Sequence, residues 1–156
     1  MKKRLFEFTC PHCRHTFYLA RDTYLIKEEK SAEYRHLKDQ TFFMHQCQSC
    51  MKLFELDYPL IYRDPNLGYT LVLSRTPISN LEEGSILTKS PKQFLRAFSI
   101  LDLNLDPASV LPVLLGIEKQ RGKLCIPFDY DEKINLLWVH CGSDTVGIPY
   151  SFRHLK

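Results

Sequence analysis

Four cysteines in two closely spaced pairs constrain this chain more than any other feature of its sequence. Cys10 and Cys13 form one C-x2-C motif, and Cys47 and Cys50 form a second one after 33 intervening residues. Two residues between cysteines allow a tight turn to direct both sulfurs toward one point about 2.3 Å from a metal ion, and two such turns complete a tetrahedron. We therefore predict that the four thiolates bind one structural Zn²⁺, with no coordination position left open for catalysis.

Short strands are predicted on both sides of each cysteine pair, as in zinc ribbons, because apolar and polar residues alternate there. These strands are expected at residues 6–9, 16–20, 41–46 and 51–58. A lobe of about 50 residues obtains only a few kcal/mol from its own core, whereas structural zinc contributes an apparent ~10–16 kcal/mol in small peptides. The sequence thus predicts a zinc-ribbon-like β-hairpin lobe over 5–56 in which the metal is a folding element.

The first cysteine pair also fits a different chemistry, since Cys10-Pro11-His12-Cys13 is a possible active site of a thiol-disulfide oxidoreductase. An activated thiolate of that class lies at the N-terminus of a helix that begins at the first cysteine, which lowers the pKa of the thiol. Residues 14–20 alternate as a strand does, and a redox motif gives no reason for a second pair. The sequence favours the structural zinc site, with the oxidoreductase as the less favoured alternative.

The rest of the chain combines strands and helices. Residues 60–63 and 69–74 are rich in β-formers and flank an Asp-Pro-Asn-Leu-Gly turn, in which the Asp64 carboxylate is expected to cap the turn. Two further strands are expected at 124–128 and 134–141.

Two helices are predicted before residue 103. Residues 27–39 are charged helix formers with few apolar positions, which predicts a solvent-facing helix. A second helix is expected to begin at Ser90-Pro91-Lys92-Gln93, because serine caps, proline suits the first helical position and glutamine follows three residues after the cap.

The start of a third helix is ambiguous because of a proline. A helix that begins at Asp106-Pro107 would place Pro112 in its interior, at a cost of about 3 kcal/mol. We therefore expect this helix to begin with Ser109 as its cap, which puts Pro112 in the first turn, and to end at Gly122.

Together these elements predict an α+β fold, in which the zinc-ribbon-like lobe is joined to an antiparallel sheet with two or three helices. We expect a single domain over 1–156, with the lobe at 5–56, a hairpin and helical core at 57–122 and C-terminal strands at 123–156. A hydrophobic content of 44% with six glycines is ordinary globular composition. The basic N-terminus lacks the long apolar core of a signal peptide, and no membrane span is present, which predicts a soluble cytoplasmic protein.

The net charge of +3 is confined to the cysteine-bearing part of the chain. Residues 1–56 carry ten Lys and Arg against seven Asp and Glu, whereas residues 57–156 carry eleven of each. Basic residues near the cysteines are candidates for phosphate contacts of a nucleic-acid-binding ribbon. They are Lys2, Lys3, Arg4, Arg14 and Lys52. The favoured interpretation is charge balance, because Zn²⁺ with four thiolates carries a charge of −2.

Cys10-Pro11-His12-Cys13, the distant Cys47-Gln48-Ser49-Cys50 and the following LIYRDP stretch together resemble the CpXC protein family. This bacterial and archaeal domain is named for its Cys-Pro-x-Cys motif, and the resemblance extends from residue 8 to about residue 120 without implying an activity. The chain departs from the family in its second pair, which lacks proline and the following glycine. Arg14 and Met51 stand where a zinc knuckle prefers glycine, which relieves left-handed backbone strain.

No P-loop, His-Glu-x-x-His or serine-elbow motif occurs in the sequence. Cys125 and Cys141 belong to no shared motif and are expected to be buried, inert thiols. We therefore predict a non-enzymatic zinc-binding module that presents a surface to a protein partner. A nucleic-acid-binding ribbon and the Cys10–Cys13 oxidoreductase are the alternatives.

Overall fold

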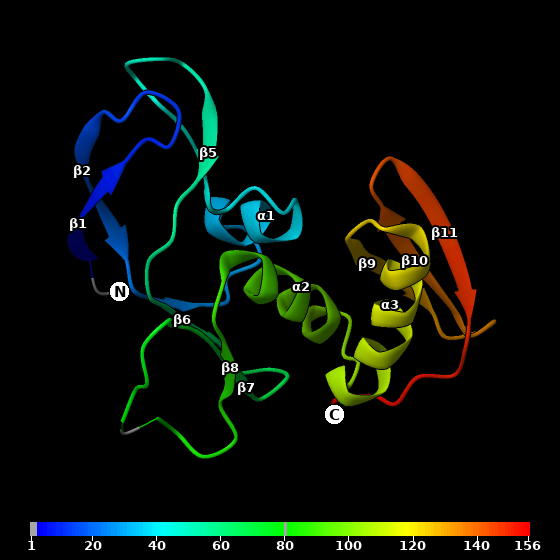
Figure 1. The fold of residues 1–156 in the computed structure, drawn as a ribbon. Helices are drawn as coiled ribbons and strands as arrows, with labels where there is room; N and C mark the ends of the chain where they lie inside the picture. The colour runs from blue at the N-terminus through cyan, green and yellow to red at the C-terminus, as the bar shows by residue number, and fades with distance from the viewer. Residues whose placement is uncertain (1–2, 80) are drawn as a thin grey trace. The chain divides into compact units, whose positions relative to one another are not determined.

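The computed structural model describes residues 3–79 and 81–156 and confirms the α+β class (Figure 1). Its helices are α1 (Ala32–Lys38), α2 (Pro91–Asp102) and α3 (Pro107–Arg121). The chain divides into two compact units, Met1–Phe94 and Leu95–Lys156, and the division falls inside α2. The predicted single domain, with internal boundaries after residues 56 and 122, stays a prediction.

The first unit contains two antiparallel hairpins, each with one cysteine pair at its tip (Figure 1). They are formed by β1 (Lys3–Thr9) with β2 (Thr16–Asp22) and by β4 (Met44–Gln46) with β5 (Leu53–Glu55). Alternation places aromatic rings on one side of the first hairpin, where Phe8 packs against Phe17 and Tyr58 at centroid distances of 5.9 and 6.2 Å. The predicted strands around both cysteine pairs are therefore confirmed, although those around the second pair are shorter than expected.

A four-stranded sheet completes the first unit, in the order β3-β6-β7-β8. Its strands are β3 (Tyr24–Ile26), β6 (Leu60–Asp64), β7 (Tyr69–Leu73) and β8 (Ile86–Thr88). The predicted β6–β7 hairpin is confirmed, and every residue of the interior strand β7 is buried. The two edge strands pair in parallel with β6 and β7, and they were not predicted because three residues carry no measurable periodicity.

Asp64 fixes the turn of the β6–β7 hairpin as expected. Its Oδ1 accepts hydrogen bonds from the backbone N–H groups of Asn66 and Leu67, both at 3.0 Å. Its Oδ2 lies 3.4 Å from Lys27 Nζ, and the Asp64 side chain is fully buried. One carboxylate therefore holds the turn and also joins it to the segment that follows β3.

The first predicted helix is shorter than expected. Helix α1 begins at Ala32, because Ser31 Oγ accepts a hydrogen bond from Tyr34 N and caps the helix there. Lys27 is extended instead of helical, since its N–H donates to the Arg63 carbonyl and continues the β3–β6 ladder. The prediction of a helix over 27–39 was therefore wrong in its first turn, where sheet pairing outweighs local helix propensity.

The start of α2 is confirmed by reciprocal capping bonds. Gln93 N donates to Ser90 Oγ at 3.2 Å, and Lys89 N donates to Gln93 Oε1 at 3.0 Å. These bonds satisfy backbone donors that the first helical turn leaves without intrahelical partners.

The predicted start of α3 was wrong. Asp106 caps the helix by accepting a hydrogen bond from Ala108 N at 3.0 Å, and Pro112 lies inside the helix. Val110 and Leu114 of this helix are buried in the core of the second unit. Burial of two aliphatic side chains contributes about 1.5–3 kcal/mol each, which offsets the cost of the internal proline. Gly122 ends the helix with φ of 66°, as expected.

The second unit packs α3 with a three-stranded antiparallel sheet, in the order β11-β10-β9. Its strands are β9 (Cys125–Asp131), β10 (Leu136–Cys141) and β11 (Asp144–Pro149). The sequence predicted only the first two, because β11 contains a glycine and ends at a proline. Gly147 has a packing reason, since a Cβ there would lie 3.2 Å from Cζ3 of Trp138.

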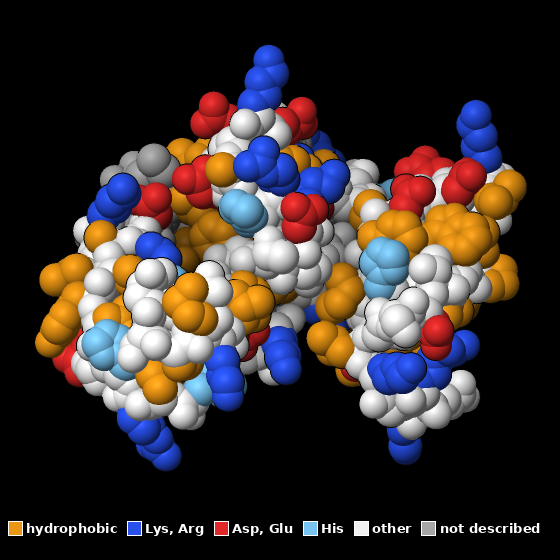
Figure 2. Space-filling view, turned by 90° about the horizontal axis from the view of Figure 1, so that it is seen from above, with side chains coloured by type: hydrophobic (Ala, Val, Ile, Leu, Met, Phe, Trp, Pro, Cys, Tyr) orange, Lys and Arg blue, Asp and Glu red, His pale blue; other side chains and the backbone are white. Residues whose placement is uncertain are grey.

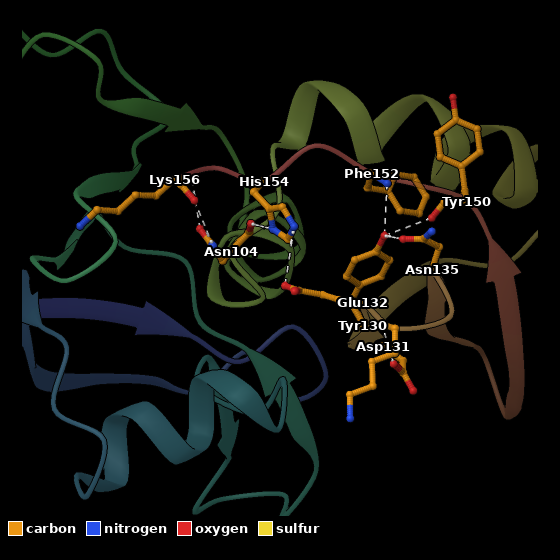
Figure 3. A network of polar contacts seen from close by, with 10 residues as sticks. Asn104, Tyr130, Asp131, Glu132, Asn135, Tyr150, Phe152, His154 and Lys156 are labelled. Carbon is orange, nitrogen blue, oxygen red and sulfur yellow. Dashed lines mark hydrogen bonds and ion pairs between the residues drawn. The ribbon is translucent and has the colours of Figure 1, made fainter.

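The Tyr130 hydroxyl ties the C-terminal segment to this sheet (Figure 3). It lies 3.2 Å from Asn135 Oδ1 and 3.3 Å from the Tyr150 carbonyl, both possible acceptors, and it accepts from Phe152 N at 3.3 Å. Farther along, the backbone of Lys156 is bonded to the side chain of Asn104. The end of the chain is thus held by polar contacts within the second unit.

Replacing Tyr130 by phenylalanine removes this hydroxyl and leaves Phe152 N–H without its acceptor. We expect the free energy of unfolding to fall by about 1–2 kcal/mol, measured by urea denaturation. Tyr150→Phe is the matched control, because Tyr150 is 52% exposed. Equal midpoints for the two variants would show that the Tyr130 hydroxyl contributes nothing to stability.

Candidate metal centre

The two hairpin tips bring the four predicted ligands together. The sulfur atoms of Cys10, Cys13, Cys47 and Cys50 all lie within 4.8 Å of one another, and among the described residues they form the cluster able to hold a metal. Cys10 and Cys47 are buried, Cys50 is partly exposed and Cys13 is exposed. The site therefore lies at the surface of the first unit, with one side open to solvent.

The two turns have the same backbone hydrogen-bond pattern. In the first, Arg14 N donates to the Cys10 carbonyl at 2.9 Å and Cys10 N donates to the His15 carbonyl at 2.8 Å. In the second, Met51 N donates to the Cys47 carbonyl at 2.8 Å and Cys47 N donates to the Lys52 carbonyl at 2.9 Å. The equivalence follows from the shared C-x2-C spacing and gives two matched knuckles that face each other.

Two of the distances between sulfurs on opposite knuckles are close to those of tetrahedral coordination. Cys10 Sγ lies 3.7 Å from Cys50 Sγ, and Cys13 Sγ lies 3.6 Å from Cys47 Sγ. A regular tetrahedron with metal–sulfur bonds of about 2.3 Å has edges of about 3.8 Å. The four residues therefore match the ligand number, ligand type and size of a closed four-cysteine metal site.

Backbone N–H groups favour the thiolate form at two of these cysteines. Hydrogen bonding from the Cys50 backbone, helped by that of Ser49, lowers the pKa of Cys47 to about 6 despite burial. Burial opposes ionisation of Cys10, but hydrogen bonds from the Cys13 and His12 backbones outweigh it and lower the pKa. The sequence pattern carries no sign of these donors, which come from the turn backbone.

The pKa of Cys50 is shifted in the opposite direction. The N–H of Lys52 lowers its pKa, but burial and the adjacent thiols of Cys10, Cys13 and Cys47 outweigh that effect and raise it to about 11. Four thiols so close together cannot all ionise without a compensating cation. The donor set is thus compatible with a bound metal ion.

Both residues that occupy the glycine position of a knuckle have left-handed backbones. Arg14 has φ of 67° and Met51 has φ of 65°. A side chain in this conformation costs roughly 1–2 kcal/mol relative to ordinary helical backbone. The strain expected from the sequence is therefore present in both turns.

The nearby histidines lie outside the sulfur cluster. His12 Nε2 lies 3.3 Å from the Leu53 carbonyl, and His45 stacks on Phe17 with a centroid distance of 5.1 Å. Burial lowers the pKa of His45. His15 also stacks against Phe17, at 6.1 Å. These side chains pack around the two turns, and none of them belongs to the cluster of four cysteines.

The segment after Cys13 bears on the oxidoreductase alternative. Residues 16–22 form strand β2, so in this described stretch no helix begins at the first cysteine to lower its pKa. Thr9 and Thr16 close the end of the hairpin through their hydroxyls, 3.1 Å apart. The first cysteine pair therefore lies in a turn between two antiparallel strands and not at the start of a helix.

The candidate nucleic-acid contacts are distributed over both hairpins. Arg14 and Lys52 are exposed beside the knuckles, Lys3 is the register partner of Asp22, and Arg4 lies over the Phe6 ring. Lys2 lies outside the described residues. On the face shown in Figure 2, Lys and Arg side chains are interspersed with Asp and Glu instead of forming one continuous patch.

The two remaining cysteines are brought together in the second unit. Cys125 and Cys141 are register partners on β9 and β10, and both are fully buried, as expected. Burial and the adjacent Cys141 thiol raise the pKa of Cys125 to about 12. Their burial is confirmed, and their adjacency was not predicted because it depends on strand register.

This arrangement predicts three stages of thiol reactivity. In metal-loaded protein, a thiol reagent should react slowly with every cysteine; a chelator should release four thiols, and a denaturant should release all six. Quantitative titration with a coloured disulfide reagent measures each stage. Cys125→Ala should lower only the final count. Reaction of Cys125 or Cys141 before denaturation would contradict the burial described above.

No helix among the described residues is long and apolar enough to cross a membrane.

The chain matches no protein-family model, no curated protein and no solved structure.

Proposed function

We propose that this protein is a non-enzymatic module in which Cys10, Cys13, Cys47 and Cys50 hold a structural Zn²⁺ and the knuckle tips present a surface to a protein partner. The observation that carries the proposal is the sulfur cluster, whose spacing matches a closed tetrahedral site. Zinc is the metal most often bound by four cysteines in two C-x2-C turns. A cytoplasmic setting, where thiols stay reduced, suits such a site.

The surface around the knuckles supports a binding role. Met51 is 58% exposed and Leu53 is 60% exposed, and Met44 on the paired strand is also exposed. We call these three residues the knuckle surface. Methionine side chains adapt their shape to a partner, and exposed apolar groups of this kind mark protein-interaction sites. Met51 is also held in a strained backbone conformation, which points to a use for its side chain.

Replacing Met51 by glycine should stabilise the fold by up to about 1 kcal/mol, because glycine adopts positive φ without steric cost. Lys52→Gly is the matched control: Lys52 is the adjacent exposed residue without positive φ, so glycine there should be neutral or destabilising. Urea denaturation of the zinc-loaded variants measures both effects. Equal destabilisation by the two glycines would rule out stored strain at Met51.

Two measurements test the proposed function. Metal analysis of protein purified without added metal should give close to one zinc per chain; iron or no metal would reject the zinc site. Affinity capture should then be repeated with Met51→Asp and with Leu124→Asp, a change at an exposed apolar residue of the second unit. A genuine partner is lost with the first variant and kept with the second, whereas a partner retained by both variants rejects the knuckle surface.

A nucleic-acid-binding ribbon is the second proposal, supported by the exposure of Arg14 and Lys52 beside the metal site. It requires binding that weakens steeply with salt and falls when both residues are replaced by glutamine. Membership of the CpXC family is likewise a proposal, supported by the two cysteine motifs and the LIYRDP strand.

A further inference from the structure

A second candidate site lies in the first unit, apart from the metal-binding cysteines. A cavity of about 490 Å³ opens between the β1–β2 hairpin and the four-stranded sheet. This volume falls within the range of small-molecule sites. The lining residues come from β1, the β2–β3 region, the start of β6, the end of β7 and the loop that follows it.

The walls of the cavity are apolar. Of its lining residues, Leu60 and Leu73 are buried, whereas Tyr24 and Ile78 are each 37% exposed. Burying apolar ligand surface against such walls contributes roughly 25 cal/mol per Å² removed from water. The cavity is therefore suited to a ligand with a hydrocarbon or aromatic body.

Of the described residues that line the cavity, Arg4 alone is charged, and no acidic side chain accompanies it there. Within the described part of the chain, Arg4 forms no ion pair or hydrogen bond, and its guanidinium lies over the Phe6 ring at 5.3 Å. The ring fixes the guanidinium without neutralising it. Its N–H groups stay available, in a planar arrangement that matches a carboxylate.

We propose that this cavity binds a small apolar monocarboxylate, with its body against Leu60 and Leu73 and its carboxylate on Arg4. An uncharged apolar ligand would leave the guanidinium unused, and a cationic one would be repelled by it. The proposal stands apart from the identity of the metal, because none of the described lining residues is a cysteine ligand.

Titration of the full chain, as purified, with octanoate tests this proposal. Methyl NMR signals of Leu60, Leu73 and Ile78 should shift saturably, and octanol and octylamine should bind more weakly. Arg4→Gln should weaken octanoate binding about tenfold or more, as expected for a lost charge-assisted hydrogen bond. Arg21→Gln is the matched control, because Arg21 is the register partner of Arg4 on β2 and does not line this cavity.

A second pair of variants keeps the test valid if Arg4→Gln disturbs the hairpin, which zinc content would reveal. Ile78→Glu places an anion at the cavity border and should abolish octanoate binding, whereas the isosteric Ile78→Gln should retain more of it. Two results would overturn the proposal. In the first, octanol binds as tightly as octanoate, and octanoate affinity does not differ between the members of each variant pair. In the second, octanoate produces no shifts at the cavity methyl groups.

Discussion

Removing the metal is expected to unfold the two hairpins of the first unit. Structural zinc contributes an apparent ~10–16 kcal/mol in small zinc peptides, more than the core of a small lobe provides. Without a bound metal, four adjacent thiols with opposite pKa shifts would remain at the hairpin tips. Hydrogen exchange of the β1, β2, β4 and β5 amides, before and after a chelator, measures the effect. We expect their protection to fall by several orders of magnitude.

Cys47→Ser provides the genetic form of this experiment. Cys47 is buried, and its Sγ lies 3.6 Å from Cys13 Sγ. Replacing Cys47 by serine therefore removes one of the four sulfur ligands expected to hold the metal. Zinc content should fall from near one per chain to near zero. Cys125→Ala is the control, because it removes a buried thiol that lies outside the sulfur cluster. Full amide protection of the hairpins in chelated wild-type protein would contradict a folding role for the metal.

Acidification should release the same metal. Zinc binds thiolates, so protons compete with it, and the stability it contributes is present at neutral pH and lost as the pH falls. A stability profile of zinc-loaded protein should therefore decline on the acid side, together with zinc release. Cys47→Ser should lack this part of the decline.

Replacing Asp64 is expected to cause the second large effect. Asp64→Ala leaves the ammonium of Lys27, which is 11% exposed, without its carboxylate. It also removes the acceptor of the Asn66 and Leu67 N–H groups. Breaking a buried ion pair by removal of one member typically costs 3–5 kcal/mol, so we expect a loss of about that size in the free energy of unfolding.

Two variants separate the contributions of Asp64. Asp64→Asn keeps an oxygen that can accept from the turn but removes the charge, so it should recover part of the loss. Asp57→Ala breaks an exposed ion pair with Arg75 and should cost less than about 1 kcal/mol. Chemical denaturation measures all three. A similar cost for Asp57→Ala and Asp64→Ala would show that burial of the Lys27–Asp64 pair has no energetic consequence.

The features that the sequence predicted well are those decided within a few residues. Each cysteine knuckle is closed by hydrogen bonds between residues four or five positions apart, so the C-x2-C spacing nearly specifies its geometry. The cap of Asp64 reaches two and three residues ahead, and the bonds that join Gln93 to Ser90 and Lys89 span about a single turn. In such segments, side-chain chemistry and backbone conformation are coupled locally.

The features that only the tertiary structure decided depend on contacts between distant segments. The parallel edge strand β3 exists because β6, more than 30 residues later, offers it hydrogen bonds, and the same ladder extends to Lys27 and shortens α1. Burial of Val110 and Leu114 against the C-terminal strands overrides the local cost of Pro112. Strand register pairs Cys125 with Cys141.

The same distinction separates the two candidate sites. The sequence by itself identified the four cysteines that cluster in the structure, because two short motifs with metal-ligand spacing contain them. The cavity beside Arg4 was decided by the tertiary structure alone, since its walls come from five segments that share no motif. The spacing of residues within a turn is enough to specify a site made of turns. A cavity lined by several segments forms only when strands distant in the sequence have paired and brought those segments together.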